Sequence, residues 1–317
     1  MKKLLLAILC LVIPVVAFGC NKESETVTVY APDGAPALAI SQMMSENFTV
    51  DGYKTEYNVV PAAQIKDKAL TADFAIVPSN MASILYNQTN GKYKIVSVNT
   101  FGNIYLVGKS GTAQIDSLAD LAGKTVYLTG QNGVPDLVFR YLLKQAGVFE
   151  QVTLTYKSDG SEIVPLLKNG SADYAVLGEP AVSQSKAVAQ TVELADLQAL
   201  WKTATGSQIG YPQAALVVDG DFAAKNPAYV KAFAQKLKGA KTWLSENAAA
   251  AGTALKNNGS LLKTELFNTN VIARCNIDYL SATDGKTIIE SFYNVIKSFN
   301  YSLIGGKLPD NDFYYSI

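Results

Sequence analysis

The hydrophobic pattern along most of the chain alternates between two kinds of segment. Short runs rich in β-branched and aromatic residues predict strands at 55–60, 94–99, 103–107, 152–157 and 214–218. Stretches with apolar residues at helical spacing predict helices at 62–70, 79–88, 162–169 and 180–190. Because strands and helices alternate, the pattern predicts an α/β fold with mostly parallel sheets that are covered by helices on both faces.

The C-terminal third has a different pattern. From Asp221 onward it is helical, and the turn signals Asn226-Pro227 and Asn258-Gly259 interrupt it. Four large apolar residues recur at helical spacing and are expected in the core: Tyr229, Phe233, Leu237 and Trp243.

One short phrase occurs twice in the chain. Residues 71–80 read TADFAIVPSN, and residues 171–180 read SADYAVLGEP. Both contain Ala-Asp, an aromatic residue, Ala and two aliphatic residues before a loop signal. Such nearly continuous apolar runs are typical of central strands that are covered on both faces. The chain therefore repeats a buried strand that leads into a loop.

A second phrase is also repeated. Residues 27–38 read VTVYAPDGAPAL, and residues 126–137 read VYLTGQNGVPDL. Each has the loop [Asp/Asn]-Gly-[Ala/Val]-Pro-x-Leu between a β-rich run and a helical pattern. The separation from this loop to the later repeated strand is kept to within one residue, from Pro36 to Asp73 and from Pro135 to Asp173. Two matched elements at matched spacing predict two lobes of like topology.

The repeated loops have unusual helix starts. Pro36 and Pro135 suit the first helical position, where the missing N–H of proline costs nothing. The residues before them, Ala35 and Val134, would then be the caps, and neither side chain can accept a hydrogen bond. Both helices would begin with free amide donors and a positive dipole end.

A partner must satisfy these amides: water, Asp33 or Asn132 bending back, or a ligand. Gly34 and Gly133 would let a ligand approach the backbone closely. The alternative is that each loop is a tight turn with Asp33 and Asn132 as ordinary turn residues. Because the same loop recurs at equivalent places, and ligands of open α/β sheets bind where strands lead into helices, we favour a ligand site.

Composition excludes several function classes. Lys and Arg together number 27, as do Asp and Glu, and no basic run stands out. The chain therefore has no signature of nucleic-acid binding or of an anionic membrane surface. The absence of histidine excludes histidine-based catalytic triads and zinc-hydrolase sites. We expect no catalytic residue, no metal and no cofactor.

The N-terminus has the features of a secretion signal. Residues 1–3 are Met-Lys-Lys, residues 4–18 are uncharged, and Gly-Cys follows. The apolar run is shorter than the ~20 residues that span a bilayer. The sequence Ala-Phe-Gly-Cys at 17–20 resembles the bacterial lipobox, although Phe18 replaces the usual small residue. We expect a signal peptide of residues 1–19, lipidation of Cys20 and a polar tether at 20–25.

The alternative for the N-terminus is plain secretion with an incidental cysteine at position 20. With Cys10 removed in the signal peptide and Cys20 acylated, Cys275 would be the remaining thiol. An intramolecular disulfide and a CxxC-type site are then impossible.

Three longer segments resemble a known family. They are SLADLAGKTVYLTGQNGVPDLVFRYLLKQAG (117–147), LLKNGSADYAVLGEP (166–180) and GYPQAALVVDGDFAAKNPAYVKAFAQ (210–235). Together with the lipidated start, they resemble the periplasmic solute-binding components of ABC importers, in the nitrate–taurine–sulfonate and thiamine-pyrimidine-precursor class. The most specific motifs are Leu-Ala-Gly-Lys-Thr-Val and Gly-x-Ala-Asp…Glu-Pro, and the resemblance covers essentially the whole mature chain.

The resemblance implies a type II periplasmic-binding-protein fold, in which two crossovers join the lobes. We place the crossovers near 105–109 and 210–213. Lobe 1 would then comprise residues 26–107 and 213–317, and lobe 2 residues 108–212. Such proteins close like a hinge on a small molecule and deliver it to a membrane permease with its ATPase. The resemblance further implies a monomer, held outside the cytoplasmic membrane by a lipid anchor.

The loops that would face the interlobe cleft supply the expected ligand-binding residues. These are Asp33, Gly34, Ala35, Ser79, Asn80, Asn99, Phe101, Gln131, Asn132, Gly133, Val134, Glu179, Tyr211 and Gln213. The arginines of the chain are Arg140 and Arg274, and neither lies in these loops. Amides, aromatic rings and one or two carboxylates favour a neutral or cationic heterocycle, such as a vitamin or pyrimidine precursor. Helix starts can also hold an anion, and Glu179 can equally be a helix-start charge.

Two other functions stay open. The first is an enzyme on the same fold that acts on a vitamin or quinone precursor, with Asp33 and Glu179 as an acid–base pair. Export with a lipid anchor argues against it, and so does the absence of the histidine on which pyrimidine-synthase relatives depend. The second is a surface lipoprotein that serves adhesion or signalling rather than transport.

Overall fold

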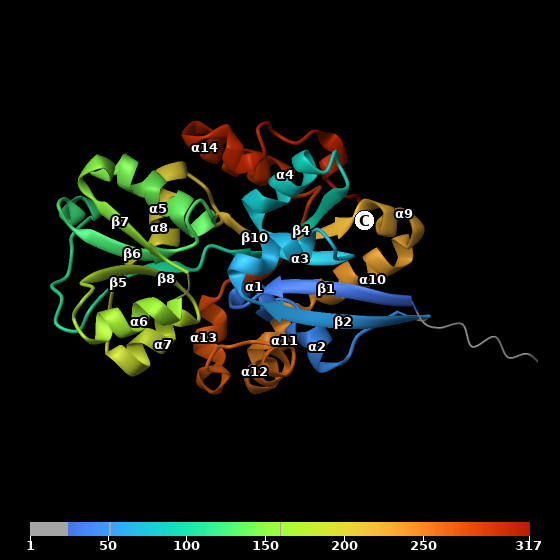
Figure 1. Ribbon diagram of the computed structural model, residues 1–317, viewed down its shortest axis with the longest axis horizontal. Coiled ribbons are helices and arrows are strands. Elements are labelled where there is room, and N and C mark those ends of the chain that lie inside the picture. The colour runs from blue at the N-terminus through green and yellow to red at the C-terminus, as the bar shows by residue number, and fades with distance from the viewer. Residues whose placement is uncertain (1–24, 51, 159) are drawn as a thin grey trace, which may run out of the picture.

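The computed structural model describes residues 25–50, 52–158 and 160–317. The predicted signal peptide and Cys20 lie outside the described residues. Two β-sheets, each with helices on both faces, lie side by side and are joined by two connections (Figure 1). The predicted two-lobed α/β fold is therefore confirmed.

The larger sheet has six strands in the order β11-β4-β10-β3-β1-β2. Their bounds are β1 (Glu25–Pro32), β2 (Tyr53–Val60), β3 (Phe74–Pro78), β4 (Tyr93–Phe101), β10 (Pro212–Asp219) and β11 (Ile277–Ser281). One face packs against α3 (Ile65–Ala69), α4 (Ser79–Gln88) and α14 (Lys286–Phe299). We call this sheet with its helices lobe 1.

The other face of this sheet is covered by seven short helices, which share one core. They are α1 (Ala35–Leu38), α2 (Ser41–Ser45), α9 (Gly220–Lys225), α10 (Pro227–Lys238), α11 (Ala240–Glu246), α12 (Ala248–Asn257) and α13 (Thr269–Arg274). Tyr229, Phe233 and Leu237 are buried there as predicted, whereas Trp243 is only partly buried. No helix in the described part of the chain is long and apolar enough to cross a membrane.

The smaller sheet has five strands in the order β7-β6-β8-β5-β9. Their bounds are β5 (Ile104–Gly108), β6 (Thr125–Thr129), β7 (Thr153–Lys157), β8 (Tyr174–Gly178) and β9 (Val192–Asp196). Its two faces are covered by α5 (Val134–Gln145) with α8 (Leu197–Thr205), and by α6 (Gly160–Lys168) with α7 (Ala181–Ala189). We call this sheet with its helices lobe 2. The sequence pattern did not predict β9, α8 or β11.

The repeated phrases fold alike. In lobe 1, β1 lies between β2 and β3 and is parallel to both, with Val29 opposite Phe74. In lobe 2, β6 lies between β7 and β8 in the same way, with Val126 opposite Tyr174. Each lobe thus contains the same three-stranded parallel unit, and its central strand leads into the repeated loop.

The sheets are mixed rather than mostly parallel as predicted, since five of the nine strand pairings among the described residues are antiparallel. The crossovers explain most of these antiparallel pairings. Strand β4 ends at the edge of its sheet that faces lobe 2, so β5 must begin at the facing edge and run away from lobe 1. It is therefore antiparallel to β8 and β9. Strand β10 returns in the same manner and is antiparallel to β3 and β4.

The strand pairing also corrects one predicted boundary. The first crossover consists of Gly102 and Asn103, because Ile104–Gly108 already pairs with β8 and β9 in lobe 2. The predicted position near 105–109, with lobe 1 extending to residue 107, was therefore too late. The second connection lies at 206–211, between α8 and β10, and overlaps the predicted place near 210–213.

Candidate functional site

One edge of the lobe 1 sheet collects many of the predicted site residues. The adjacent strands β4, β10, β3 and β1 bring together Asn99 and Phe101, Gln213, Ser79 and Asn80, and Asp33 with Gly34. The carboxyl ends of β1, β3 and β4 meet there with the amino end of the antiparallel strand β10. This is the edge at which ligands of open α/β sheets bind.

The facing edge of the lobe 2 sheet carries the remaining residues. Gln131 to Val134 follow β6, Glu179 follows β8, and Asn103 precedes the antiparallel strand β5. The Gly102 amide donates a hydrogen bond of 3.0 Å to the Tyr211 carbonyl, so the two crossovers run side by side. The two edges therefore face each other where the chain crosses between lobes.

A direct contact joins the loops of the two lobes. The Asn80 side-chain Nδ2 donates to the Asn132 carbonyl at 3.2 Å and to the Leu303 carbonyl at 3.1 Å. Since Nδ2 serves two carbonyl oxygens, the orientation of the amide is fixed. Its Oδ1 atom is buried and accepts no hydrogen bond from the protein.

Asn80 Oδ1 belongs to a larger group of buried, unpaired oxygens near the crossovers. The others in the described part of this region are Asn99 Oδ1, Thr100 Oγ1, Asn103 Oδ1, Gln198 Oε1, Tyr211 Oη and Gln213 Oε1. Buried polar atoms are almost always paired, because leaving one unpaired costs about 1–3 kcal/mol. Amide oxygens accept hydrogen bonds, so a bound molecule with N–H or O–H groups would satisfy them.

The helix starts differ in detail from the prediction. The caps are Gly34 and Gly133, one residue earlier than predicted, and neither has a capping side chain. Helix α1 has only four residues, so its dipole is weak. In the second loop the Asn132 amide donates to the buried Asp136 carboxylate at 2.8 Å. The Asp136 carboxylate lies within α5 and satisfies an amide that precedes the cap Gly133, not the first amides of the helix for which the sequence suggested Asn132 as a partner.

Asp33 is engaged by a distant loop. Its carboxylate accepts hydrogen bonds from the Ser260 hydroxyl at 2.6 Å, the Leu261 amide at 2.8 Å and the Gly34 amide at 3.0 Å. Asp33 thus fastens the segment after α12 to the end of β1 and closes its own turn. This is one of the structural roles that the sequence left open.

Glu179 is likewise held by protein groups. Its side chain is fully buried, and it accepts hydrogen bonds from the Ser183 amide and hydroxyl at the start of α7. Its third donor is Arg274 Nε of lobe 1, at 2.6 Å. Glu179 is therefore a helix-start charge, as the alternative interpretation had it, and it also pairs with an arginine from the other lobe.

Arg274 reaches a second carboxylate in lobe 2. Its Nη2 donates to Glu193 at 2.8 Å, and its guanidinium lies 4.0 Å from the centroid of the Tyr105 ring. Partial burial lowers the pKa of Arg274, but the hydrogen bond to Glu179 and the nearby negative charge raise it above its usual range. Burial raises the pKa of Glu193, but Lys186 and Arg274 together lower it below its ordinary value.

Several other predicted residues are structural. The Ser79 hydroxyl donates to the Pro212 carbonyl at 2.6 Å, and Ala35 and Val134 are buried in the two cores. Tyr211 is fully buried, with its ring 5.6 Å from Trp201 and 6.3 Å from Phe292. Phe101 is partly buried against the core, and the Gln131 and Asn132 side chains are exposed.

Sequence reasoning missed Thr100, Asn103, Gln198 and Arg274. Thr100 and Asn103 flank the predicted Phe101, so the placement of the crossover would have found them. Gln198 lies on α8, which was not predicted, and Arg274 lies in the C-terminal helical region. The described residues contain no group of three or more acidic or cysteine side chains arranged to hold a metal ion.

A comparison with known protein families shows to which family the chain belongs. The sequence model described as "NMT1/THI5 like" matches residues 68–251, which is more than half of the chain. The chain belongs to the NMT1/THI5-like family. The match begins in lobe 1, spans the whole of lobe 2 and re-enters lobe 1. A search among curated proteins found no match.

Solved structures similar to this NMT1/THI5-like protein have the same fold. An ABC transporter protein from Parabacteroides distasonis has a TM-score of 0.76 and 23% identity, with 92% of this chain and 99% of that chain covered. The periplasmic aliphatic sulphonate binding protein SsuA of Escherichia coli gives 0.70 and 15%, with 92% of each chain covered. The periplasmic nitrate-binding protein NrtA of Synechocystis PCC 6803 gives 0.66 and 15%, with 88% and 82% covered. These likenesses confirm the type II periplasmic-binding-protein fold.

Proposed function

We propose that the protein is the extracytoplasmic solute-binding component of an ABC importer. It captures a small organic solute between its lobes and delivers it to a permease that works with an ATPase. One observation carries this proposal: two facing sheet edges meet at the crossovers with buried, unpaired oxygens of Asn80, Asn99, Asn103 and Gln213. The names of the similar solved structures support the transport role. Two of them name anions, an aliphatic sulphonate and nitrate, and the solute class proposed below differs from both.

The solute that fits these groups is a neutral or cationic heterocycle, such as a vitamin or pyrimidine precursor. Both arginines already have partners: Arg274 pairs with Glu179 and Glu193, and Arg140 lies 3.6 Å from Asp136. An anion such as a sulfonate or nitrate needs hydrogen-bond donors, whereas the unpaired atoms are mostly acceptors. Matching these acceptors to the N–H or O–H groups of a solute offsets the cost of burying them.

The enzyme alternative is less favoured. It requires Asp33 and Glu179 as an acid–base pair, and protein donors hold both carboxylates. We further propose that the signal peptide directs export and that Cys20 anchors the mature monomer to the membrane by its lipid. In that location the protein would meet extracytoplasmic solutes rather than cytoplasmic metabolites.

The first test is to identify the solute. Native mass spectrometry of protein purified gently from cells would detect a retained molecule. Thermal shifts against a panel of vitamins, amino-heterocycles, alkanesulfonates and nitrate would follow, since a ligand at a hundredfold excess over its Kd stabilises the folded state by about 2.7 kcal/mol. Shifts with sulfonates or nitrate alone would overturn the proposed solute class.

A matched pair of variants locates the site. Gln213→Leu removes an oxygen that has no protein partner, so it should abolish the thermal shift with little change in unliganded stability. Ser79→Ala removes a hydroxyl bonded to Pro212 at the same edge, so it should lower stability by about 1 kcal/mol. An unchanged thermal shift in Gln213→Leu would place the solute elsewhere.

A further inference from the structure

The two lobes touch on opposite sides of the crossovers, and the two contacts differ in chemistry. On one side, α14 of lobe 1 lies against α5 and α8 of lobe 2; we call this the aromatic contact. On the other side, α13 of lobe 1 approaches β8 and α7 of lobe 2; we call this the ionic contact. Figure 1 shows α14 at the top of the molecule, near α5 and α8, and α13 at the bottom, near α7.

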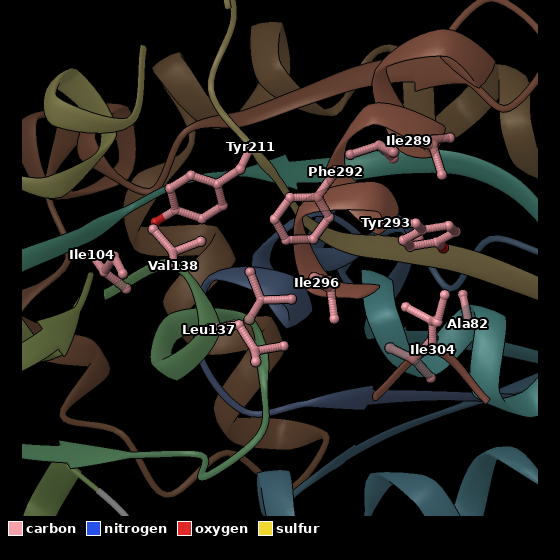
Figure 2. Packing of buried hydrophobic residues seen from close by; sticks show 14 of the residues in the cluster. Ala82, Ile104, Leu137, Val138, Tyr211, Ile289, Phe292, Tyr293, Ile296 and Ile304 are labelled. Carbon is pink, nitrogen blue, oxygen red and sulfur yellow. The ribbon is translucent and has the colours of Figure 1, made fainter. Parts of the chain in front are cut away.

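The aromatic contact is built like a protein core. The Phe292 ring of α14 lies 5.6 Å from the Trp201 ring of α8, and both residues are buried. Figure 2 shows Leu137 and Val138 of α5 gathered with Phe292 and Ile296. Separating the lobes on this side would expose all of this apolar surface to water, which is strongly unfavourable.

Charged side chains extend the aromatic contact at its rim. Lys144 Nζ lies 4.1 Å from the centroid of the Phe299 ring, and the Arg140 guanidinium lies 5.3 Å from the same centroid. Both cations belong to α5 of lobe 2, whereas Phe299 ends α14 of lobe 1. The contact therefore continues without a break from the buried core to the surface.

The ionic contact depends on few groups. Arg274 bridges Glu179 and Glu193, and Lys186 also pairs with Glu193 at 2.6 Å. Two cations thus balance two carboxylates, and three of these four groups belong to lobe 2. When the lobes separate here, water can solvate the freed charges, so opening costs much less than at the aromatic contact.

Apolar packing at the ionic contact is also limited. A small hollow of about 10 Å³ lies next to α13, between Pro180 and Ser183 of lobe 2 and Leu262 and Phe267 of lobe 1. Pro180 is the apolar residue that lobe 2 contributes to its lining. Among the described residues, the lining on this side contains no aromatic ring from lobe 2, whereas the aromatic contact packs Trp201 of lobe 2 against Phe292 of lobe 1.

We propose that the lobes open at the ionic contact and pivot at the aromatic contact, and that Arg274 is the latch of the closed form. Arg274 acts by joining lobe 1 to two lobe 2 carboxylates, not by touching the solute. This inference goes beyond the proposed function, because it concerns the conformation of the unliganded protein. It stands or falls whatever the solute is.

Distances across the two contacts test the proposal. Spin labels at Ala187→Cys and Asn270→Cys span the ionic contact, and labels at Gln145→Cys and Ser298→Cys span the aromatic contact; all four positions are exposed. The native Cys275 is buried, and protein without introduced cysteines gives the background labelling. In the unliganded protein, Arg274→Ala should deplete the short-distance population of the first pair and leave the second pair unchanged.

Two further variants keep the test decisive. Glu193→Gln removes one of the two carboxylate partners of Arg274 and keeps Glu179. It should therefore reduce the short-distance population less than Arg274→Ala does. If Arg274→Ala does not fold, Glu193→Gln alone decides the question. Lys241→Ala is the matched control, because the Lys241–Asp278 ion pair of 2.6 Å lies within lobe 1. The proposal would be overturned if the distance between labels at 187 and 270 stayed unchanged in the latch variants. It would also be overturned if the distance between labels at 145 and 298 became longer.

Discussion

The aromatic and ionic contacts join the same two lobes but use opposite chemistry. Across the aromatic contact a single apolar cluster runs from Ile289 in lobe 1 to Leu137 in lobe 2. Across the ionic contact, the lobes are joined by a guanidinium and two carboxylates. The difference teaches that an interface between two lobes need not be uniform. Apolar burial can fix the orientation of the lobes on one side, while charge pairing lets them separate on the other side.

The largest expected effect is on the aromatic contact. Phe292→Ala removes a ring that is 2% exposed and should lower the free energy of unfolding by about 3–5 kcal/mol. Urea denaturation measures this loss. Tyr301→Ala, at a residue that is 52% exposed, serves as the control and should change stability by less than about 0.5 kcal/mol. A loss below about 1 kcal/mol for Phe292→Ala would mean that this contact is not core-like.

An intermediate effect is expected at Asp33, which lies in neither contact. Asp33→Ala leaves the Ser260 hydroxyl and the Leu261 amide without their acceptor, so we expect a loss of about 1–3 kcal/mol. Thermal or urea unfolding of the unliganded protein checks it. If stability is unchanged while solute binding disappears, Asp33 is a ligand group after all.

A kinetic effect is expected at the ionic contact. Arg274→Ala should raise the solute dissociation rate about tenfold through loss of the latch, since affinity changes within one interface appear mostly in dissociation. It should also lower the free energy of unfolding, because the Glu179 carboxylate that loses its arginine partner is fully buried. Stopped-flow release of the identified solute measures the dissociation rate. In Arg274→Lys the rate should lie between those of the native protein and Arg274→Ala. An unaltered rate in Arg274→Ala would argue against the latch.

The smallest effect near neutral pH follows from Glu193. Burial raises its pKa, but Lys186 and Arg274 hold it below the ordinary value of 4.5. A carboxylate with a lowered pKa stabilises the closed form above its ordinary pKa and loses that contribution as the pH falls through the lowered value. The distance between labels at Ala187 and Asn270 should therefore stay constant down to about pH 4.5 and lengthen below it. If the distance already lengthened at pH 6, a titrating group other than Glu193 would control the opening.

Part of the candidate site was accessible to sequence reasoning. The strand-end loops predicted Asn80, Asn99 and Gln213, whose oxygens are buried without partners. The same reasoning took Ser79 as a ligand residue, although its hydroxyl is bonded to the Pro212 carbonyl. Strand ends can be read from a sequence, but the direction of each side chain depends on the β-bulges between β4 and β10 and on the packing of α14.

The sequence by itself determined two lobes of like topology. Hydrophobic periodicity indicates which face of each strand and helix is buried, and two segments with the same pattern at nearly the same spacing favour the same local fold. Only the tertiary structure decided how the lobes meet. Arg274 and Glu179 are 95 residues apart and belong to different lobes. Their pairing depends on how two finished surfaces dock, and no local pattern records that geometry.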